Sequence, residues 1–371
     1  MKIEFYKVNQ PMINVFEHAE SGRSCSDSII LSFFYKGIDA IGECAPRRYV
    51  TNQTTDDVIQ ELKNIEISEL IKEICLDSFE DSIIKIKSTK LSESLCTNCI
   101  LEISLLDWIG KKHNRSLWEI LNIIKNKSEV FDNFKVTEVM DLSISPDKFL
   151  RERGPFHTVK IKVRNNISEA INRVSFVREK LGNSIKIILD ANMCWTLNTA
   201  IENIKKISEY NIDYYEEPLK KGSFDEYRIL RQAVDCNIML DETVCSIDDL
   251  LMAIRLKSCD AINIRISKNG GILSAIKMID ICRNEGMAYQ IGAQVAEVGP
   301  LICAGRHLRA ISDDALTFEG GQPDRWFDAH IIEPMPLVNR DKNIAYRMNG
   351  RGLGCSLTHN FKYRGAHNEG N

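Results

Sequence analysis

The sequence predicts an α/β fold in which a closed barrel of parallel strands carries a second, α+β module. Two observations favour this class. From Val136 onward, short apolar strands alternate with longer amphipathic stretches, which is typical of repeated βα units around a parallel sheet. Before that point the chain shows strand patterning and then helical spacing. At 371 residues the chain is long enough for a barrel with an attached domain.

The first module begins with strands and continues with helices. The apolar run Ser28–Tyr35 is followed by a turn at Gly37 and a second run, Asp39–Cys44, which together predict an antiparallel meander. Helical spacing dominates from Thr54 to about Leu121. It is clearest where apolar residues recur near every 3.6 positions, at Ile100, Ile103, Leu106 and Ile109.

Eight strands are predicted in the second region, which suits a closed β/α barrel. They are Val136–Ile144, Thr158–Val163, Ile185–Asp190, Tyr214–Glu216, Ile238–Asp241, Ala261–Arg265, Ala288–Gln294 and Leu316–Glu319. We therefore expect a capping module over residues 1–125, completed by residues 327–371, and a barrel over 126–326. The turn-rich stretch Met348–Cys355 is expected to return to the first module.

Composition excludes several classes of function. A formal net charge of −4 with interspersed charges offers no face that neutralises phosphates, so nucleic acid is an unsuitable partner. No apolar run reaches the ~18 residues of a membrane span, and the N-terminus lacks a signal-peptide core, so we expect a cytoplasmic protein. The 12 Cys are scattered singly apart from Cys96-x-x-Cys99, which has no second Cys or His pair to complete a zinc site, so they are expected to be reduced and mostly buried. No glycine-rich phosphate loop follows an early strand, which argues against a nucleotide enzyme.

Ionisable residues end successive predicted strands. Lys162, Asp190, Glu216, Asp241 and Arg265 follow one another at intervals of 24 to 28 residues. That interval is about one βα unit, so these residues are expected to ring the carboxyl end of the barrel, where barrel enzymes keep their chemistry. Strand parity places the same residues on the inner face.

Three adjacent carboxylates at this end favour a metal site. Asp190, Glu216 and Asp241 would repel one another unless a cation lay among them, and hard oxygen ligands suit Mg²⁺. The alternative is three independent helix caps or ion pairs. Glu217 and Glu242, one residue further on, are expected to point away from the lumen as supporting or outer residues.

Two lysines, Lys160 and Lys162, share one inward face of the second predicted strand. A solvated pair is the simple alternative. Lysines buried beside a cation have depressed pKa values and can act as bases, which favours a catalytic role here.

Taken together, these motifs resemble the enolase superfamily, specifically the muconate-lactonizing-enzyme subgroup with its dipeptide epimerases and o-succinylbenzoate synthases. The resemblance covers almost the whole chain. The barrel motifs that carry it are Lys160-x-Lys162, Leu189-Asp-Ala-Asn-x-x-Trp195, Glu216-Glu-Pro218, Asp241-Glu-Thr and Lys268-Asn-Gly-Gly271. In the capping module they are Gly42-Glu-x-Ala-Pro46, Leu105-Leu-Asp107 and Gly350-x-Gly-Leu-Gly354.

The resemblance implies a modified (β/α)7β TIM-type barrel with a cap built from both termini. It further implies Mg²⁺ on Asp190, Glu216 and Asp241, and a small-molecule carboxylate substrate whose α-proton is removed to give an enediolate. Lys162 would be the base, and Lys160 would stabilise the developing charge. Homo-oligomers are usual in the family, so we expect one here.

One position departs from the family pattern. Most relatives carry a lysine where this chain has Arg265, and a guanidinium with a pKa above ~12 is a poor acid or base. We therefore expect a one-base reaction, either a dehydratase-type syn elimination or a cycloisomerisation, with Arg265 stabilising the planar intermediate. Racemisation or epimerisation is the alternative and would need Lys268 or a deprotonated Arg265 on the opposite face.

Substrate contacts are expected from two loops and two strand ends. The loops Phe16–Ser26 and Arg47–Thr51 correspond to segments that close over the family's site, which makes Arg47 and Tyr49 candidates. Glu297 and Glu319 are the candidates after strands seven and eight. The Asp-x-Asp that holds an ammonium group in dipeptide epimerases is missing, since Phe318-Glu319-Gly-Gly stands there.

A non-catalytic homologue that binds Mg²⁺ and a carboxylate is the alternative from another class. Arg265 is its only support. Retention of both lysines and all three carboxylates argues against it, because buried like charges cost stability unless function requires them.

Overall fold

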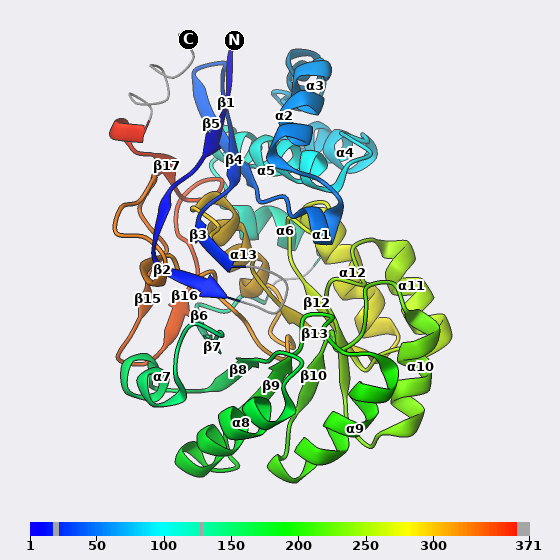
Figure 1. Ribbon diagram of the computed structural model, residues 1–371. Helices are drawn as coiled ribbons and strands as arrows, with labels where there is room; N and C mark the ends of the chain where they lie inside the picture. The colour runs from blue at the N-terminus through cyan, green and yellow to red at the C-terminus, as the bar shows by residue number, and fades with distance from the viewer. Residues whose placement is uncertain (18–21, 127–128, 362–371) are drawn as a thin grey trace.

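The computed structural model describes residues 1–17, 22–126 and 129–361. Figure 1 shows two regions, an antiparallel sheet with its helices at the top and a curled parallel sheet with outer helices below. The parallel sheet has the order β13-β12-β11-β10-β9-β8-β7. This is the predicted fold class, a TIM-type barrel under an α+β cap. The exact domain bounds, 1–125 with 327–371 and 126–326, stay a prediction.

The cap is a three-stranded antiparallel sheet with helices on one side. Its strands are β1 (Lys2–Val8), β4 (Ser28–Tyr35) and β5 (Ile38–Cys44), in the order β1-β4-β5. A separate hairpin pairs β2 (Pro11–Glu17) with β3 (Gly22–Cys25). The helices are α1 (Arg48–Thr51), α2 (Thr55–Asn64), α3 (Ile67–Ile74), α4 (Phe79–Ser88), α5 (Leu95–Lys112) and α6 (Leu117–Lys125).

The helical region predicted from Thr54 to about Leu121 contains α2 to α6, and its clearest segment is divided between two helices, α5 and α6. The first, α5, is buried around most of its circumference because it lies between the cap sheet and the barrel. Asn114 then adopts a left-handed conformation, with φ of 55°. Ser116 and Glu119 form a reciprocal capping box that starts α6, so the chain turns between the helices.

Seven parallel strands form the barrel wall. They are β7 (Thr137–Met140), β8 (Thr158–Lys162), β9 (Lys186–Asp190), β10 (Tyr214–Glu216), β11 (Ile238–Leu240), β12 (Ala261–Ile264) and β13 (Ala288–Ile291). The outer helices are α7 (Pro146–Arg153), α8 (Ile167–Leu181), α9 (Leu197–Ile207), α10 (Phe224–Ala233), α11 (Ile247–Leu256), α12 (Ile272–Asn284) and α13 (Pro300–Ala310). Several of these helices begin at a Ser, Thr or Asn whose side chain accepts a backbone N–H, which fixes where the strand-to-helix loops end.

The predicted eighth strand, Leu316–Glu319, closes the barrel without forming a full ladder. The amide of Glu319 donates to Ile291 O of β13 at 3.1 Å, and the amide of Thr137 in β7 donates to Phe318 O at 2.8 Å. Within this segment, the strand pairing is limited to one isolated bridge, between Phe318 and Ile291 of β13. The barrel is therefore closed between its first and seventh strands by this short segment.

The C-terminal segment returns to the cap, as expected from its turn-rich sequence. Gly352 exchanges hydrogen bonds with Arg115 and Leu117, and the amide of Leu353 donates to Asp107 of α5 at 2.8 Å. Short sheets connect it to the barrel, namely β15 (Val338–Asn339), β16 (Ile344–Tyr346) and β6 (Asn133–Lys135), with β14 (Ile332–Glu333) beside β17 (Ser356–Leu357). Residues beyond 361 lie outside the described part.

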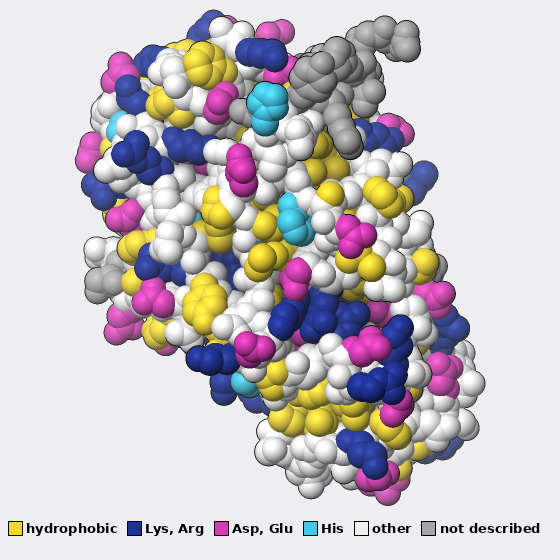
Figure 2. Space-filling model, turned by 90° about the vertical axis from the view of Figure 1, so that its left-hand side faces the viewer, with side chains coloured by type: hydrophobic (Ala, Val, Ile, Leu, Met, Phe, Trp, Pro, Cys, Tyr) yellow, Lys and Arg dark blue, Asp and Glu magenta, His cyan; other side chains and the backbone are white. Residues whose placement is uncertain are grey.

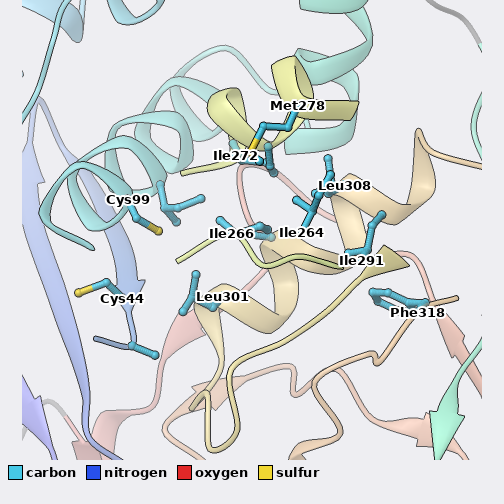
Figure 3. Close-up of a cluster of buried hydrophobic side chains, with 14 of the residues drawn as sticks. Cys44, Cys99, Ile264, Ile266, Ile272, Met278, Ile291, Leu301, Leu308 and Phe318 are labelled. Atoms are coloured by element: carbon cyan, nitrogen blue, oxygen red, sulfur yellow. The ribbon is translucent and has the colours of Figure 1, made fainter. Parts of the chain in front are cut away.

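One continuous apolar cluster joins cap and barrel. Figure 3 shows Cys44 and Cys99 from the cap sheet and α5 on one side of it, and Ile264, Ile266 and Leu301 from the barrel on the other. All 12 cysteines are free thiols and most are buried, in agreement with expectation. Over the described residues, no helix has the length and apolar character needed to span a membrane.

Candidate active site

A pocket lies at the carboxyl ends of the barrel strands, and residues of the β2–β3 hairpin and of α1 also line it. Its floor and walls include most of the residues that the sequence indicated, brought together from separate strands: Lys160, Lys162, Asp190, Asp241, Arg265, Glu319, Arg47 and Tyr49. Glu216 lies directly below, fully buried. The regular βα interval therefore predicted a real spatial cluster.

The three carboxylates come from neighbouring strand ends. Asp190 ends β9, Glu216 ends β10 in register with it, and Asp241 follows the last residue of β11. All three are buried, with relative exposures of 1%, 0% and 3%. Burial of acids at this density is costly unless cations accompany them.

Lys160 is the cation that two of these acids, Asp190 and Glu216, contact together with Glu319. Its Nζ lies 3.1 Å from Asp190, 2.8 Å from Glu216 and 2.9 Å from Glu319. Burial lowers the pKa of Lys160, but the carboxylates of Asp190 and Glu216 outweigh burial and hold the pKa well above its ordinary value. Lys160 is therefore a permanent ammonium group.

Lys162 lies beside Lys160 on the inner face of β8. Its Nζ is 2.8 Å from Asp190 Oδ2 and 2.8 Å from Asn192 Oδ1, and it stands 5.7 Å from the centre of the Phe16 ring. The amine thus faces the pocket, with the hairpin residue Phe16 on one side. Burial opposes ionisation of Asp190, but Lys160 and Lys162 lower the pKa of that acid to about 2.

The charges do not all balance. Burial raises the pKa of Glu216 to about 8, and although Lys160 opposes this, Asp190 and Asp241 add to it. A further positive charge at the strand ends would let all the acids ionise together.

The donor set suits Mg²⁺, since three carboxylates supply the hard oxygens that this ion prefers. Among the described residues, however, no three His, Cys, Asp or Glu side chains are grouped around a common metal position. The reason is visible in the contacts: Asp190 and Glu216 turn their oxygens to Lys160, and Asp241 turns to Arg265 and Lys268. Metal binding requires these oxygens to turn from the amines to the ion.

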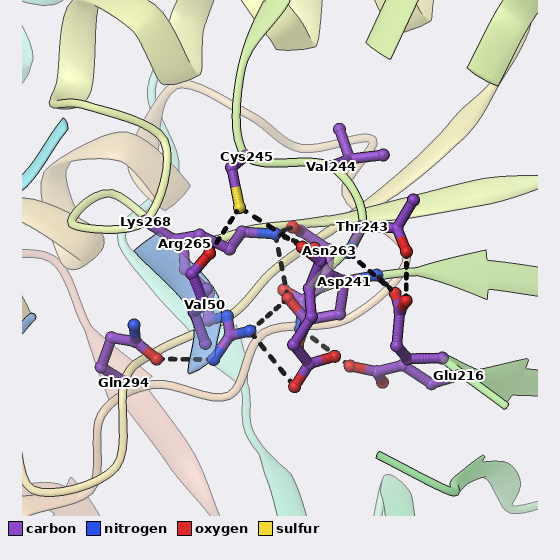
Figure 4. A network of polar contacts seen from close by, with 12 residues as sticks. Val50, Glu216, Asp241, Thr243, Val244, Cys245, Asn263, Arg265, Lys268 and Gln294 are labelled. Atoms are coloured by element: carbon purple, nitrogen blue, oxygen red, sulfur yellow. Dashed lines mark hydrogen bonds and ion pairs between the residues drawn. The ribbon is translucent and has the colours of Figure 1, made fainter. Parts of the chain in front are cut away.

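Arg265 faces the pocket from β12, across the barrel from the lysines of β8, as strand parity predicted. Its Nη2 is 2.5 Å from Asp241 Oδ1 and its Nη1 donates to Gln294 Oε1 at 2.5 Å (Figure 4). Burial lowers the pKa of Arg265, but the carboxylates of Asp241 and Glu242 outweigh burial and raise the pKa above its ordinary value. The guanidinium therefore stays protonated.

Lys268, the other candidate for this side, does not line the pocket. It is fully buried, and its Nζ donates to Asp241 O at 2.6 Å, Asp241 Oδ1 at 2.9 Å and Asn263 O at 2.7 Å (Figure 4). Its three donors are used in holding the strand ends together.

The expectation for Glu242 was wrong, while Glu217 lies as expected. Glu217 is buried behind the strand ends, where its Oε2 accepts the amide of Asp241 at 2.6 Å. Glu242 lines the pocket instead, with Oε1 3.3 Å from Asn192 Nδ2 and 3.7 Å from Arg265 Nη2. Strand β11 ends at Leu240, so the alternation of side chains no longer holds at Glu242.

The substrate candidates divide into two groups. Tyr49 and Glu319 line the pocket, and Glu319 also accepts the amide of Ala293 at 2.8 Å. Arg47 lines it too, although its guanidinium is bound to Asp27 at 2.5 Å and to Val295 O at 2.6 Å. Glu297 lies outside this pocket and accepts the amide of Gln294 at 2.8 Å. Residues 18–21 of the loop that includes Phe16 lie outside the described part.

Sequence reasoning missed one wall of the pocket. Arg153, Arg325, Glu138 and Trp326 line it, from the end of α7, from β7 and from the segment after strand eight. These residues follow no strand-end interval and are distant in sequence, so periodicity carried no signal for them.

Comparison with known proteins places the chain in a family. A model of the enolase C-terminal domain-like family matches residues 147–360, more than half of the chain. A hydrophobic dipeptide epimerase from Enterococcus faecalis is 29% identical over 283 residues, 74% of this chain and 76% of that protein. An N-succinyl-L-Arg/Lys racemase from Bacillus cereus is 26% identical over 329 residues, 85% of each chain.

Solved structures agree in fold. The structure of the Bacillus cereus N-succinyl Arg/Lys racemase has a TM-score of 0.84 at 23% identity and covers 98% of this chain and 96% of its own. An Enterococcus faecalis dipeptide epimerase complexed with Mg and L-Leu-L-Tyr has a TM-score of 0.79 at 24% identity, covering 96% and 98%. From the family match and the enzymes it resembles, the chain belongs to the enolase C-terminal domain-like family and is an enzyme of the enolase superfamily.

Proposed function

We propose that the protein removes the proton α to the carboxylate of a small organic acid or amino-acid derivative, with Lys162 as the base. The observation that carries this proposal is the position of the Lys162 amine, which faces the pocket 2.8 Å from Asp190 and beside the permanent ammonium of Lys160. An amine on the inner face of the strand, directed into the pocket, is placed to take a proton from the carbon next to a bound carboxylate.

The remaining groups stabilise the anion that forms. Lys160 is held by three acids and directs fixed positive charge into the pocket, where negative charge develops on the substrate carboxylate. Asp190, Glu216 and Asp241 would hold Mg²⁺, which when bound supplies further positive charge to that carboxylate. The Enterococcus dipeptide epimerase structure, complexed with Mg, supports this assignment.

We favour a one-base reaction, either a syn elimination or a cycloisomerisation. Arg265 occupies the side of the pocket opposite Lys162, and its guanidinium stays protonated between Asp241 and Gln294. Lys268 is buried away from the pocket with its donors on Asp241 and Asn263. Neither group is suited to exchange a proton with the second face of the substrate carbon.

Epimerisation is the second candidate, and the relatives favour it. The Enterococcus dipeptide epimerase and the Bacillus cereus racemase both invert a stereocentre by name, whereas a Bacillus subtilis o-succinylbenzoate synthase, 24% identical over 340 residues, represents the lyase class. That the chain works as a homo-oligomer in the cytoplasm stays a prediction.

Proton exchange tests the proposal. Chiral N-acyl amino acids, dipeptides and 2-hydroxy acids are incubated with the enzyme and Mg²⁺ in D₂O and followed by mass spectrometry and chiral chromatography. We expect deuterium at the α-carbon of at least one acid, with retained configuration, and a loss of about 100-fold or more in Lys162→Ala. Lys186→Ala, an exposed lysine at the far end of the neighbouring strand, is the control and should exchange normally.

Two outcomes contradict parts of this proposal. Exchange that survives in Lys162→Ala removes that lysine from its role. Accumulation of deuterated product with inverted configuration in the wild type replaces the one-base reaction with epimerisation.

A further inference from the structure

The outer wall of the pocket is lined by arginines that the proposed proton abstraction does not use. Arg23 comes from β3, Arg153 from the end of α7 and Arg325 from the segment after strand eight. We call these three residues the arginine wall. On the face of the molecule that Figure 2 presents, Lys and Arg side chains gather near the middle.

At the arginine wall, a single carboxylate contacts two guanidinium groups in two places. Glu138 lies 3.2 Å from Arg325 Nη2 and 3.2 Å from Arg340 Nη1, so one carboxylate contacts two guanidinium groups, although Arg340 also pairs with Asp324 at 2.6 Å. Asp27 likewise lies 2.6 Å from Arg23 and 2.5 Å from Arg47. The Nε of Arg325 is buried and has no hydrogen-bond partner among the described residues.

Arg153 is the clearest case. Within residues 1–17, 22–126 and 129–361, its side chain has neither an ion-pair nor a hydrogen-bond partner, although it is half-buried against the pocket. Burial and the charge of Arg325 lower its pKa, with Glu138 opposing them in part. A guanidinium that is partly desolvated and faces a like charge costs free energy, and an anion between the two arginines would offset that cost.

We infer that Arg153 and Arg325 bind an oxyanion at the end of the substrate remote from its reacting carboxylate, so that the substrate is a dianion. This inference rests on the proposed function, because it assumes that the α-carboxylate lies at the strand ends. The two ends of the pocket then have separate roles. The lysines of β8 receive the reacting carboxylate, and the arginine wall selects the second anionic group and sets the length of the substrate.

Guanidinium groups bind carboxylate and phosphate alike through paired N–H donors. The shared chemistry is therefore an oxyanion, and the probes must separate its two sources. Glycine derivatives serve well because they carry the α-carboxylate and can differ only at the far end. N-succinylglycine carries a second carboxylate, N-(3-phosphonopropionyl)glycine a phosphonate, and N-butyrylglycine an uncharged chain of similar length.

Binding of these three probes is measured by calorimetry in the presence of Mg²⁺. We expect at least one charged probe to bind wild-type enzyme about 10-fold or more tightly than N-butyrylglycine, since a charge-assisted pair contributes that much. The preference should fall to about 3-fold or less in Arg153→Met and in Arg325→Met. The better of the two charged probes identifies carboxylate or phosphate as the group selected.

The control is Arg151→Met, which removes the same charge from the same helix at an exposed position paired with Asp147. It should keep the full preference. Arg153→Met should also be at least as stable to heat as the wild type, because it removes a partnerless charge, so that lost selectivity is not lost folding.

Equal affinity for charged and uncharged probes, or no measurable affinity for any of them, overturns the inference. So does a preference that survives in both arginine variants. The proposed function fails by a different result, namely α-proton exchange that does not depend on Lys162. If only the role of the arginine wall were wrong, the enzyme would still exchange the α-protons of N-butyrylglycine.

Discussion

At the scale of single residues, the proposed one-base reaction rests on Arg265. Its guanidinium is held in place by Asp241 and Gln294, each 2.5 Å away, with Glu242 at 3.7 Å. A lysine at this position would present an amine to the face of the substrate opposite Lys162. The arginine presents charge but stays protonated at neutral pH, so it is a poor base for that face. In the proposed function, this side chain therefore separates a one-base reaction from an inversion.

Arg265→Lys is expected to open the second route. In D₂O exchange with a chiral acid, the ratio of inverted to retained product should rise at least about 10-fold over wild type, because an acid/base group is worth that or more. Arg265→Met is the matched control, since it lacks both charge and proton and should show no gain in inversion. A lysine variant that exchanges with retention only would mean that the group at residue 265 does not reach the α-carbon.

At the scale of elements, two barrel helices begin on acids supplied by the cap. Glu43 of β5 accepts the amides of Val298 at 2.8 Å, Gly299 at 3.1 Å and Leu301 at 3.0 Å, at the start of α13. Glu102 of α5 accepts the amide of Leu273 at 3.0 Å, at the start of α12. Carboxylates are favourable at helix N-termini, so the cap and barrel are fastened together through these helices.

Glu102 makes stability depend on pH. Burial raises its pKa from 4.5 to about 7, against the backbone amides of Leu273 and Ile272. Between pH 4.5 and about 7 the Glu102 carboxyl keeps its proton in the folded state but has lost it in the unfolded state. The contribution of Glu102 to the free energy of unfolding is therefore full below pH 4.5 and is lost as the pH rises to about 7. Relative to Glu102→Gln, wild-type unfolding free energy should therefore fall by about 3 kcal/mol over that range, at 1.36 kcal/mol per pH unit.

Urea unfolding at several pH values measures this difference. Glu93→Gln is the control, because it makes the same substitution at an exposed position of the cap. A difference between wild type and Glu102→Gln that is constant from pH 4.5 to 7.5 would show that Glu102 titrates normally in the folded protein.

At the scale of the whole molecule, the repeated βα units of the barrel were predictable because each unit is encoded by a short continuous stretch of sequence. Each βα unit carries its own alternation of strand and helix, so Asp190, Glu216 and Asp241 were placed at one end of the barrel by counting. Parity failed at Glu242, where the strand had already ended. Strand parity also could not predict that Arg153 and Arg325 line the same pocket. Their proximity results from the closing of the barrel and not from any pattern along the chain.

The C-terminal segment, whose return to the cap was predicted from its turn-rich sequence, supports a last prediction. Gly352 has φ of +58° and lies so close to α5 that an added Cβ would be 2.2 Å from Asp107 Oδ1 and 2.6 Å from Asp107 O. Asp107 also accepts the amides of Ile41 and Leu353, so displacing it disturbs cap sheet and tail together. Gly352→Ala should lose roughly 2–5 kcal/mol of unfolding free energy, from backbone strain and overpacking combined.

Gly305 provides the matched substitution, since it lies within α13 with nothing within 4 Å of an added Cβ. Gly305→Ala should be neutral or gain about 0.5–1 kcal/mol, because alanine is the better helix former. Both variants are compared with wild type by urea unfolding. If Gly352→Ala unfolds at the wild-type midpoint, the tail does not pack on α5 through this glycine, and the cap is not held to the rest of the molecule by its C-terminal segment.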